Sequence, residues 1–376
     1  MKLMNILVAG LLLLGAAACS DDDKPTFPEE PIYDMTGFAK GADVSWLTQM
    51  EASGKKFYTV SGRETECMTL LRDLGMNSIR LRVWVNPSDG WCNKNDVLAK
   101  AWRAHQLGMR LMIDFHYSDV WADPGSQHKP AAWEGLSLDE LKAAMTAHTK
   151  DVLSALKDKG ITPEWVQVGN ETGPGMLWDT DAAVSGGMGG NGVEYVENKK
   201  NFSDFITTGC VAVKEVFPNA KVIVHLQGGD DNNLYRWIFD VLKENNAQYD
   251  VIGMSLYPGT DTWKTMTSSC IANMKDMVSR YNKEVMICEV GMSWDEAATS
   301  KEFLTELIAQ SKAIDECLGV FYWEPQSYGG WNGYTLGAFD ESGKPTVAMD
   351  AFNPVSYTHL RCRRRRECRS RWSPYH

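Results

Sequence analysis

Two glutamates, each near the end of an apolar β-type run, have the residue type and setting of a catalytic pair. Glu171 ends the run EWVQVGNE (164–171) directly after Asn170, and Glu289 lies near the end of EVMICEVG (284–291). Cleavage of a glycosidic bond needs two carboxyl groups, because the leaving oxygen must be protonated while the oxocarbenium-like transition state needs a negative partner. The pair therefore indicates glycosidic-bond chemistry, provided that the fold brings the two side chains together.

The remainder of the chain predicts the elements that would do this. From Gly37 onward, short β-type runs alternate with helical patterns such as 62–75, 138–160 and 300–314, which is typical of a parallel sheet wrapped by helices. The eight expected strands are 38–45, 78–85, 110–117, 164–171, 221–226, 250–257, 284–291 and 319–325. Eight such units predict a closed (β/α)₈ TIM barrel. No linker or composition shift divides 37–353, so we expect one catalytic domain there.

Polar or aromatic residues that do not suit a core stand at the ends of these strands. They are Asp43, Arg82, Asp114, His116, Asn170, Glu171, Tyr257, Glu289, Trp323 and Glu324. In a (β/α)₈ barrel the carboxyl ends of the strands form the active-site face, so these side chains should converge on one pocket. The fourth and seventh strands lie across the barrel mouth, which predicts carboxyls about 5–5.5 Å apart, the spacing of a retaining pair.

An Asn-Glu pair on the fourth strand with a Glu on the seventh resembles the large clan of retaining glycoside hydrolases built on this barrel. The resemblance implies that Glu171 is the general acid/base and Glu289 the nucleophile. It further implies that Asn170 hydrogen-bonds the sugar 2-hydroxyl and that Tyr257 hydrogen-bonds the nucleophile. Arg82 is expected to lie near Glu289 and keep that carboxylate ionised by charge pairing.

Longer segments resemble one family of the clan, the arabinogalactan endo-β-1,4-galactanases of glycoside hydrolase family 53. The matching segments are 40–47, 77–87, 112–133, 168–178 and 322–325. The stretch SDVWADPGSQHKPAAW (118–133) is the most specific, because its residues serve no general purpose in a barrel. The resemblance spans about 37–352 and implies endo-acting hydrolysis of β-1,4-galactan with retention of configuration.

Further substrate contacts are expected around the pair. The resemblance places His116 and Asp119 at the substrate-facing loop after the third strand, and Trp121, which is family-like, is a further expected contact. Asp43 and Asp114 are equally compatible with substrate contact and with a structural role. Fourteen Trp are many for 376 residues, and flat indole faces suit sugar rings. Trp323 belongs to the expected contacts, and Trp331 is either a sugar platform or packing on the barrel rim.

The chain predicts neither a metal nor another cofactor. Some bacterial members of the family carry a long calcium-binding loop after the eighth strand, whereas the corresponding segment 324–345 is short and has few acidic residues. The cysteines lack the CxxC spacing of a zinc site, and the glycine-rich segments lack a phosphate-binding loop. Disulfide pairing stays open.

Charge limits the possible partners. The formal net charge is −11, and 355–376 contribute seven Arg against one Glu, so the remainder of the chain is still more acidic. An acidic body argues against nucleic acid as a partner, since phosphate binding needs a concentrated basic surface. We interpret 354–376 as a non-native or disordered tail. The expected partner is the polysaccharide, and we expect a monomer.

The N-terminus predicts export. Residues 1–18 contain Lys2, an apolar run over 6–14 and small residues before Cys19, as in a signal peptide. Small residues directly before a cysteine resemble a bacterial lipobox, which implies a lipid on Cys19; the alternative is an ordinary cleaved signal. With 19–36 as a tether, we expect a lipoprotein of the cell surface or outer membrane that faces outward and touches the membrane only through its lipid.

Two other functions remain possible from the residues. Another retaining β-glycanase of the clan, such as a mannanase or an endoglucanase, would share the catalytic pair and differ only in its subsites. A non-catalytic glycan-binding lipoprotein would keep the barrel as a scaffold. The presence of Glu171, Glu289 and Asn170 argues against the second alternative.

Overall fold

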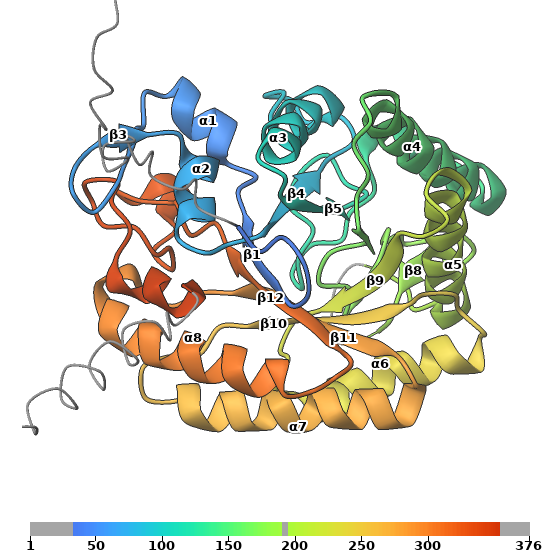
Figure 1. Cartoon of the computed structure of the whole chain (residues 1–376). Coiled ribbons are helices and arrows are strands. Elements are labelled where there is room, and N and C mark those ends of the chain that lie inside the picture. Colours follow the sequence, from blue (N-terminus) through green and yellow to red (C-terminus); the bar gives the residue numbers. More distant parts are fainter. Residues whose placement is uncertain (1–32, 190–194, 354–376) are drawn as a thin grey trace, which may run out of the picture. The chain divides into compact units, whose positions relative to one another are not determined.

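The computed structural model describes residues 33–189 and 195–353, and its centre is a closed barrel of eight parallel strands (Figure 1). The barrel strands are β1 (Ala39–Asp43), β4 (Ser78–Val83), β5 (Arg110–Phe115), β6 (Trp165–Val168), β9 (Lys221–Leu226), β10 (Val251–Leu256), β11 (Glu284–Val290) and β12 (Cys317–Trp323). They close in the order β1-β12-β11-β10-β9-β6-β5-β4. The predicted (β/α)₈ barrel is confirmed, and each expected strand corresponds to one of these eight.

Helices surround the barrel on the outside (Figure 1). They are α1 (Leu47–Ala52), α2 (Cys67–Asp73), α3 (Lys94–Gln106), α4 (Leu138–Asp158), α5 (Lys199–Val216), α6 (Asn232–Glu244), α7 (Trp263–Tyr281) and α8 (Ala297–Lys312), with short 3₁₀ segments η1 (Ala131–Trp133), η2 (Trp294–Glu296), η3 (Trp331–Gly333) and η4 (Val347–Phe352). The prediction for 138–160 matches α4, which begins where Ser137 and Glu140 form a capping box.

The helix expected over 62–75 begins later than predicted. Residues Glu64–Thr65 form a strand, β3, which pairs with β2 (Phe57–Tyr58). Helix α2 starts only at Cys67, because the Glu66 side chain accepts hydrogen bonds from the Met68 and Thr69 amides and caps the first turn. A second small hairpin, β7 (Gly175–Met176) with β8 (Gly186–Gly187), lies within the glycine-rich segments after β6.

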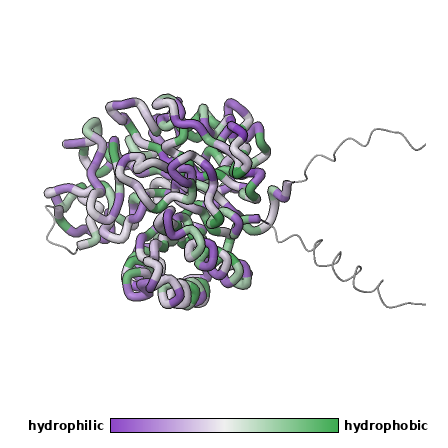
Figure 2. Tube along the Cα trace, turned by 90° about the vertical axis from the view of Figure 1, so that its left-hand side faces the viewer, coloured by the Kyte–Doolittle hydropathy of each residue, from purple (hydrophilic) through white to green (hydrophobic). Residues whose placement is uncertain are grey.

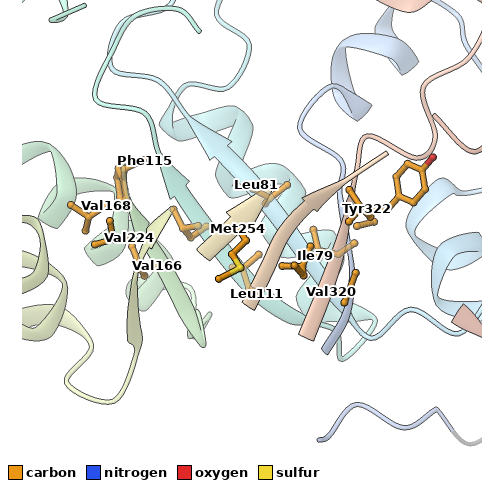
Figure 3. Close-up of a cluster of buried hydrophobic side chains, with 14 of the residues drawn as sticks. Ile79, Leu81, Leu111, Phe115, Val166, Val168, Val224, Met254, Val320 and Tyr322 are labelled. Carbon is orange, nitrogen blue, oxygen red and sulfur yellow. The ribbon is translucent and has the colours of Figure 1, made fainter. Parts of the chain in front are cut away.

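Apolar side chains pack on both faces of the barrel wall. Figure 3 shows the outer layer, which comes from β4, β5, β6, β9, β10 and β12 and packs under the helices. Hydrophobic and hydrophilic residues alternate along the trace in Figure 2, as expected for elements with one buried face. Inside, an apolar floor is formed by Ala39, Met112, Trp165, Ile223, Val251, Met286 and Phe321. Polar side chains lie above this floor, toward the carboxyl ends of the strands.

Strand β11 contains a bulge that determines where Glu289 points. Ile287 pairs with Met254 of β10, but the next partners are Glu289 and Ser255, so Cys288 is an extra residue. Val285 and Ile287 point outward and pack in the outer layer. If side chains alternated strictly along the strand, Glu289 would point outward as well. The bulge shifts the alternation by one residue and directs the Glu289 carboxylate into the barrel mouth.

Six cysteines lie in the described part of the chain, and all six are buried free thiols. Burial raises the pKa of each: Cys67, Cys92, Cys210, Cys270, Cys288 and Cys317. Among the described helices, none is both long and apolar enough to cross a membrane. The expected signal peptide, Cys19, most of the tether and the C-terminal tail lie outside the described residues.

Candidate active site

A cleft of about 750 Å³ opens at the carboxyl ends of the strands and contains both glutamates. Its walls are formed by Trp46, Gln49, Arg82, Trp84, Asp89, Trp91, Cys92, His116, Trp121, Ala122, Asp123, Asn170, Glu171, Tyr257, Glu289, Trp323, Asn332, Gly333, Tyr334 and Leu336. Aromatic rings therefore line a site whose interior carries carboxyl groups.

The Glu289 carboxylate is held by two neighbours. Arg80 Nη1 lies 2.9 Å from Oε1, and the Tyr257 hydroxyl donates a hydrogen bond of 2.8 Å to Oε2. Burial raises the pKa of Glu289, while Arg80 and Tyr257 act in the opposite direction by stabilising the ionised form. Both carboxylate oxygens are thus fixed in place, as a nucleophile needs.

Glu171 lies just past the end of β6, where the chain turns. Its φ of 45° is in the left-handed region that residues other than glycine rarely adopt, and such backbone conformations cluster at functional sites. Burial raises the pKa of Glu171, and the negative charges of Asp123 and Asp114 raise it further. The two carboxyls also interact, because the negative charge of Glu171 is among the causes that raise the pKa of Glu289.

Arg80, and not Arg82, is the cation beside Glu289. The guanidinium of Arg80 is fully buried and lies 2.7 Å from Asp43, 2.9 Å from Asp114 and 2.9 Å from Glu289. It also donates to Gln167 at 2.6 Å. One arginine therefore forms ion pairs with three carboxylates, of which Asp43 and Asp114 lie below the cleft and Glu289 lines it.

The expected pairing of Arg82 with Glu289 is wrong. Arg82 lies in the cleft wall, with its guanidinium carbon 4.0 Å from the ring centroid of Trp121 and a nitrogen 3.7 Å from Glu324. Both arginines project from β4 into the barrel, since they are two residues apart. Arg80 is in register with Asp43 of β1, whereas Arg82, two residues nearer the carboxyl end of β4, is in register with Asp114 of β5. Arg80 therefore lies deeper in the barrel than Arg82.

Asp43 and Asp114 were expected either to contact substrate or to have a structural role, and their contacts are structural. Both are fully buried below the cleft, where they bind Arg80 and do not line the walls. Asp43 also accepts hydrogen bonds from the backbone and hydroxyl of Ser45, at 2.9 and 2.6 Å. They act on the site through the arginine.

His116 lines the cleft, but protein contacts occupy both of its ring nitrogens. Nδ1 accepts from Trp84 Nε1 at 3.3 Å and from the Ala122 amide at 3.0 Å, so the ring proton resides on Nε2. That nitrogen donates to Asp114 at 3.1 Å. Burial lowers the pKa of His116 and favours the neutral ring, which presents only its edge and face to a ligand.

The other expected contacts divide between the cleft and the rim. Asn170 lines the cleft, accepts a hydrogen bond from Arg80 at 2.9 Å and donates to the Ala122 carbonyl at 2.8 Å. Trp121 and Trp323 form part of the wall, where their rings pack against Trp46 at centroid distances of 5.6 and 5.0 Å. Trp331 packs against the core and is not among the lining residues, in contrast to Asn332, Gly333 and Tyr334 that follow it.

Several lining residues were not expected from the sequence. Trp46, Gln49, Trp84, Asp89, Trp91 and Cys92 come from the segments that follow the first and second barrel strands. The high Trp count and their position shortly after strand ends were the available signal. The described residues contain no group of three or more His, Cys, Asp or Glu side chains arranged to hold a metal ion.

Arg80→Met is expected to lower the free energy of unfolding by about 3–5 kcal/mol at pH 7, because three buried carboxylates would lose their shared cation. Without the cation, burial raises the pKa of these carboxyls, so the loss should shrink as the pH falls and they take up protons. Urea denaturation at pH 7 and pH 5 measures this difference. Arg82→Met is the matched control, and a loss for Arg80→Met that does not change with pH would contradict the account.

A (β/α)₈ barrel with two interacting carboxyls in an aromatic cleft at its carboxyl-terminal face defines a glycoside hydrolase of the barrel class. The family model "Glycosyl hydrolase family 53" matches residues 39–352. The chain belongs to this family and is an enzyme of the glycoside hydrolase type.

Similar proteins agree with this assignment. The chain is 31% identical over 319 residues to an endo-β-1,4-galactanase of Bacillus subtilis (strain 168), which covers 77% of this chain and 70% of the relative. It is 28% identical over 349 residues to an arabinogalactan endo-β-1,4-galactanase of Thermothelomyces thermophilus, covering 84% and 99%. A solved structure of a fungal β-1,4-galactanase superposes with a TM-score of 0.75 at 27% identity, covering 84% of this chain and 99% of the other.

Proposed function

We propose that the enzyme cleaves β-1,4-galactosidic bonds within galactan or arabinogalactan chains and retains the anomeric configuration. The observation that carries the proposal is the placement of Glu171 and Glu289 in one cleft, with Glu289 held by Arg80 and Tyr257. The names of the family relatives support galactan as the substrate. The aromatic walls supply flat surfaces for successive sugar rings.

In the proposed mechanism each carboxyl acts twice. Glu171 donates its proton to the glycosidic oxygen while Glu289 attacks the anomeric carbon, which forms a covalent galactosyl-enzyme and releases the leaving chain. Glu171, now ionised, takes a proton from water as the water attacks the same carbon, and Glu289 leaves. Two inversions give net retention. Arg80 and Tyr257 orient Glu289 and favour its ionised form in the first step.

Side-by-side hydrolysis of linear galactan, mannan and carboxymethylcellulose tests the substrate. We expect reducing ends from galactan alone, with short oligosaccharides early and monosaccharide late, as endo action requires. Faster release from mannan or carboxymethylcellulose would favour the other retaining β-glycanases. Proton NMR of the first product tests the mechanism, since a retaining enzyme releases the β-anomer before it mutarotates.

We further propose that the enzyme is exported, anchored by a lipid on Cys19 and exposed on the cell surface as a monomer. The apolar run over 6–14 and the small residues before Cys19 support export and the anchor. The complete cleft within one chain supports a monomer. The formal net charge of −11 disfavours nucleic acid as a partner.

Cys19→Ala is expected to release the enzyme from membranes, because the lipid would be the only attachment. Fractionation of cells that express the wild type and the variant, followed by immunoblotting, measures the distribution. Wild-type protein that is processed but wholly soluble would refute the anchor and leave export intact. Activity on galactan should be equal in the two proteins, which serves as the control for folding.

A further inference from the structure

A buried ion pair on α3 lies behind one wall of the cleft. The Lys100 side chain is fully buried, and its ammonium group lies 2.6 Å from Oδ2 of Asp96, one helical turn earlier. The side chain of Asp96 is itself only 8% exposed. Removal of two charges from water costs free energy that their attraction only partly offsets, so a buried pair is weak evidence for stability. Its presence is better explained by what it holds in place.

The ammonium group holds the segment that follows β1. It has three hydrogen-bond partners, one for each of its protons. Lys100 donates to the Ser45 carbonyl at 2.6 Å, to the Thr48 hydroxyl at 3.3 Å and to Asp96. The Thr48 hydroxyl in turn donates to Oδ1 of Asp96 at 2.5 Å. Since Ser45 and Thr48 lie on either side of Trp46 in the chain, the ion pair fixes the turn that carries this indole ring.

The carboxylate holds the segment that follows β4. Oδ2 of Asp96 accepts a hydrogen bond of 2.7 Å from the Cys92 amide, and the Cys92 carbonyl accepts one of 2.9 Å from the Trp84 amide. The φ of Cys92 is 60°, a left-handed conformation that costs free energy in a residue other than glycine. Such a conformation persists only where the surrounding structure fixes it, and here Asp96 and Trp84 bind the backbone of Cys92 on both sides.

The two segments together form one wall of the cleft. They supply the lining residues Trp46, Gln49, Trp84, Asp89, Trp91 and Cys92. In the barrel β1 and β4 are neighbours, with β12 between β1 and β11 and with β5 between β4 and β6. The wall is therefore one strand removed from each strand that positions a catalytic glutamate. Three of its residues are tryptophans, whose flat rings suit the sugars of a chain that extends beyond the bond being cleaved.

We propose that Lys100 and Asp96 are positioning residues, whose ion pair sets the spacing of the two segments and thereby shapes a wall that binds the sugar chain. This inference rests on the proposed function. Neither member of the pair lines the cleft, so both act on the substrate through the backbone that they hold. The pair should contribute to binding and not to the chemical step. Its contribution should grow with the number of sugar rings that reach the wall.

The test is the steady-state kinetics of Lys100→Met on linear galactan and on β-1,4-galactooligosaccharides of increasing length. Loss of the cation loosens both segments, so KM on galactan should rise roughly tenfold while kcat stays within about twofold of the wild type. The rise in KM should be smallest on the shortest oligosaccharide that the wild type cleaves. Thermal unfolding followed by circular dichroism shows whether the variant is folded at the assay temperature, since loss of one partner of a buried pair is strongly destabilising.

Thr48→Val is a milder second variant, because it removes one hydroxyl from the network and leaves both charges in place. KM on galactan should rise about threefold, the size of one lost hydrogen bond. Lys94→Met is the matched control, since Lys94 lies on the same helix but pairs with Asp151 at the surface. Its KM and kcat should match those of the wild type.

A fall in kcat at constant KM in folded Lys100→Met, or an equal rise in KM at every chain length, would overturn the proposal. If Lys100→Met does not fold, an unchanged KM in Thr48→Val would overturn it instead. Failure of the proposed function is seen separately, as a wild type that releases nothing from galactan. The same variants can then be compared on oligosaccharides of whichever β-glycan the wild type cleaves.

Discussion

Glu289→Ala is expected to reduce galactan hydrolysis by on the order of 10⁴-fold or more, because no covalent galactosyl-enzyme can form without the nucleophile. The loss should be similar on every substrate, including aryl galactosides with good leaving groups. Added azide can enter the space left by the carboxylate and attack the anomeric carbon directly. The product would then be the inverted α-galactosyl azide, which NMR distinguishes from the β-anomer.

Glu284→Ala is the matched control for this variant. Glu284 begins the same strand at the far end of the barrel, where it pairs with Lys221 at the surface. Its removal should leave activity at the wild-type level. If Glu289→Ala kept substantial activity, or if azide gave the β-galactosyl azide, the assignment of Glu289 as the nucleophile would be refuted.

Glu171→Ala should fail selectively. Natural galactan has a poor leaving group that needs protonation, so its cleavage is expected to fall by on the order of 10³-fold or more. An aryl galactoside with an acidic phenol needs no such help and should still form the galactosyl-enzyme, with a burst of phenol. Azide would then accelerate breakdown of that intermediate and give the β-galactosyl azide, with net retention.

Glu164→Ala is the control for Glu171→Ala. Glu164 lies just before β6, the strand that Glu171 follows, and pairs with Arg110 away from the cleft. It should cleave both substrates normally. Equal losses on galactan and on the activated galactoside would contradict the acid/base role of Glu171. A β-galactosyl azide from Glu289→Ala together with an α-galactosyl azide from Glu171→Ala would show that the two roles are reversed.

The strands of the barrel could be predicted because each is a short apolar run ended by polar residues, a pattern that is local in sequence. The start of α2 could not, because the capping contact of Glu66 and the pairing of β3 with β2 override the helical periodicity of 62–75. Propensity within a segment is a weak guide where a cap or a hairpin competes for the same backbone.

The site shows the same division between local and non-local information. The two glutamates were predictable from residue type and strand position. The choice between Arg80 and Arg82 was not, because both face the barrel interior and only the register with β1 and β5 sets their depth. The orientation of Glu289 depends on the bulge at Cys288, which the run EVMICEVG does not reveal. Depth and bulges arise from pairing between strands, which a single sequence does not contain.

The six buried thiols have a consequence for how the enzyme loses activity on heating. In the folded barrel they are inert, because burial disfavours the reactive thiolate. Once the chain unfolds in an oxidising medium, the same thiols are exposed and form mismatched disulfides within and between molecules. Unfolding then becomes irreversible. The half-life of activity under oxidising conditions is therefore set by the rate of unfolding and not by the folding equilibrium. A reducing agent should therefore increase the activity recovered after a heat pulse, while leaving the rate of unfolding unchanged.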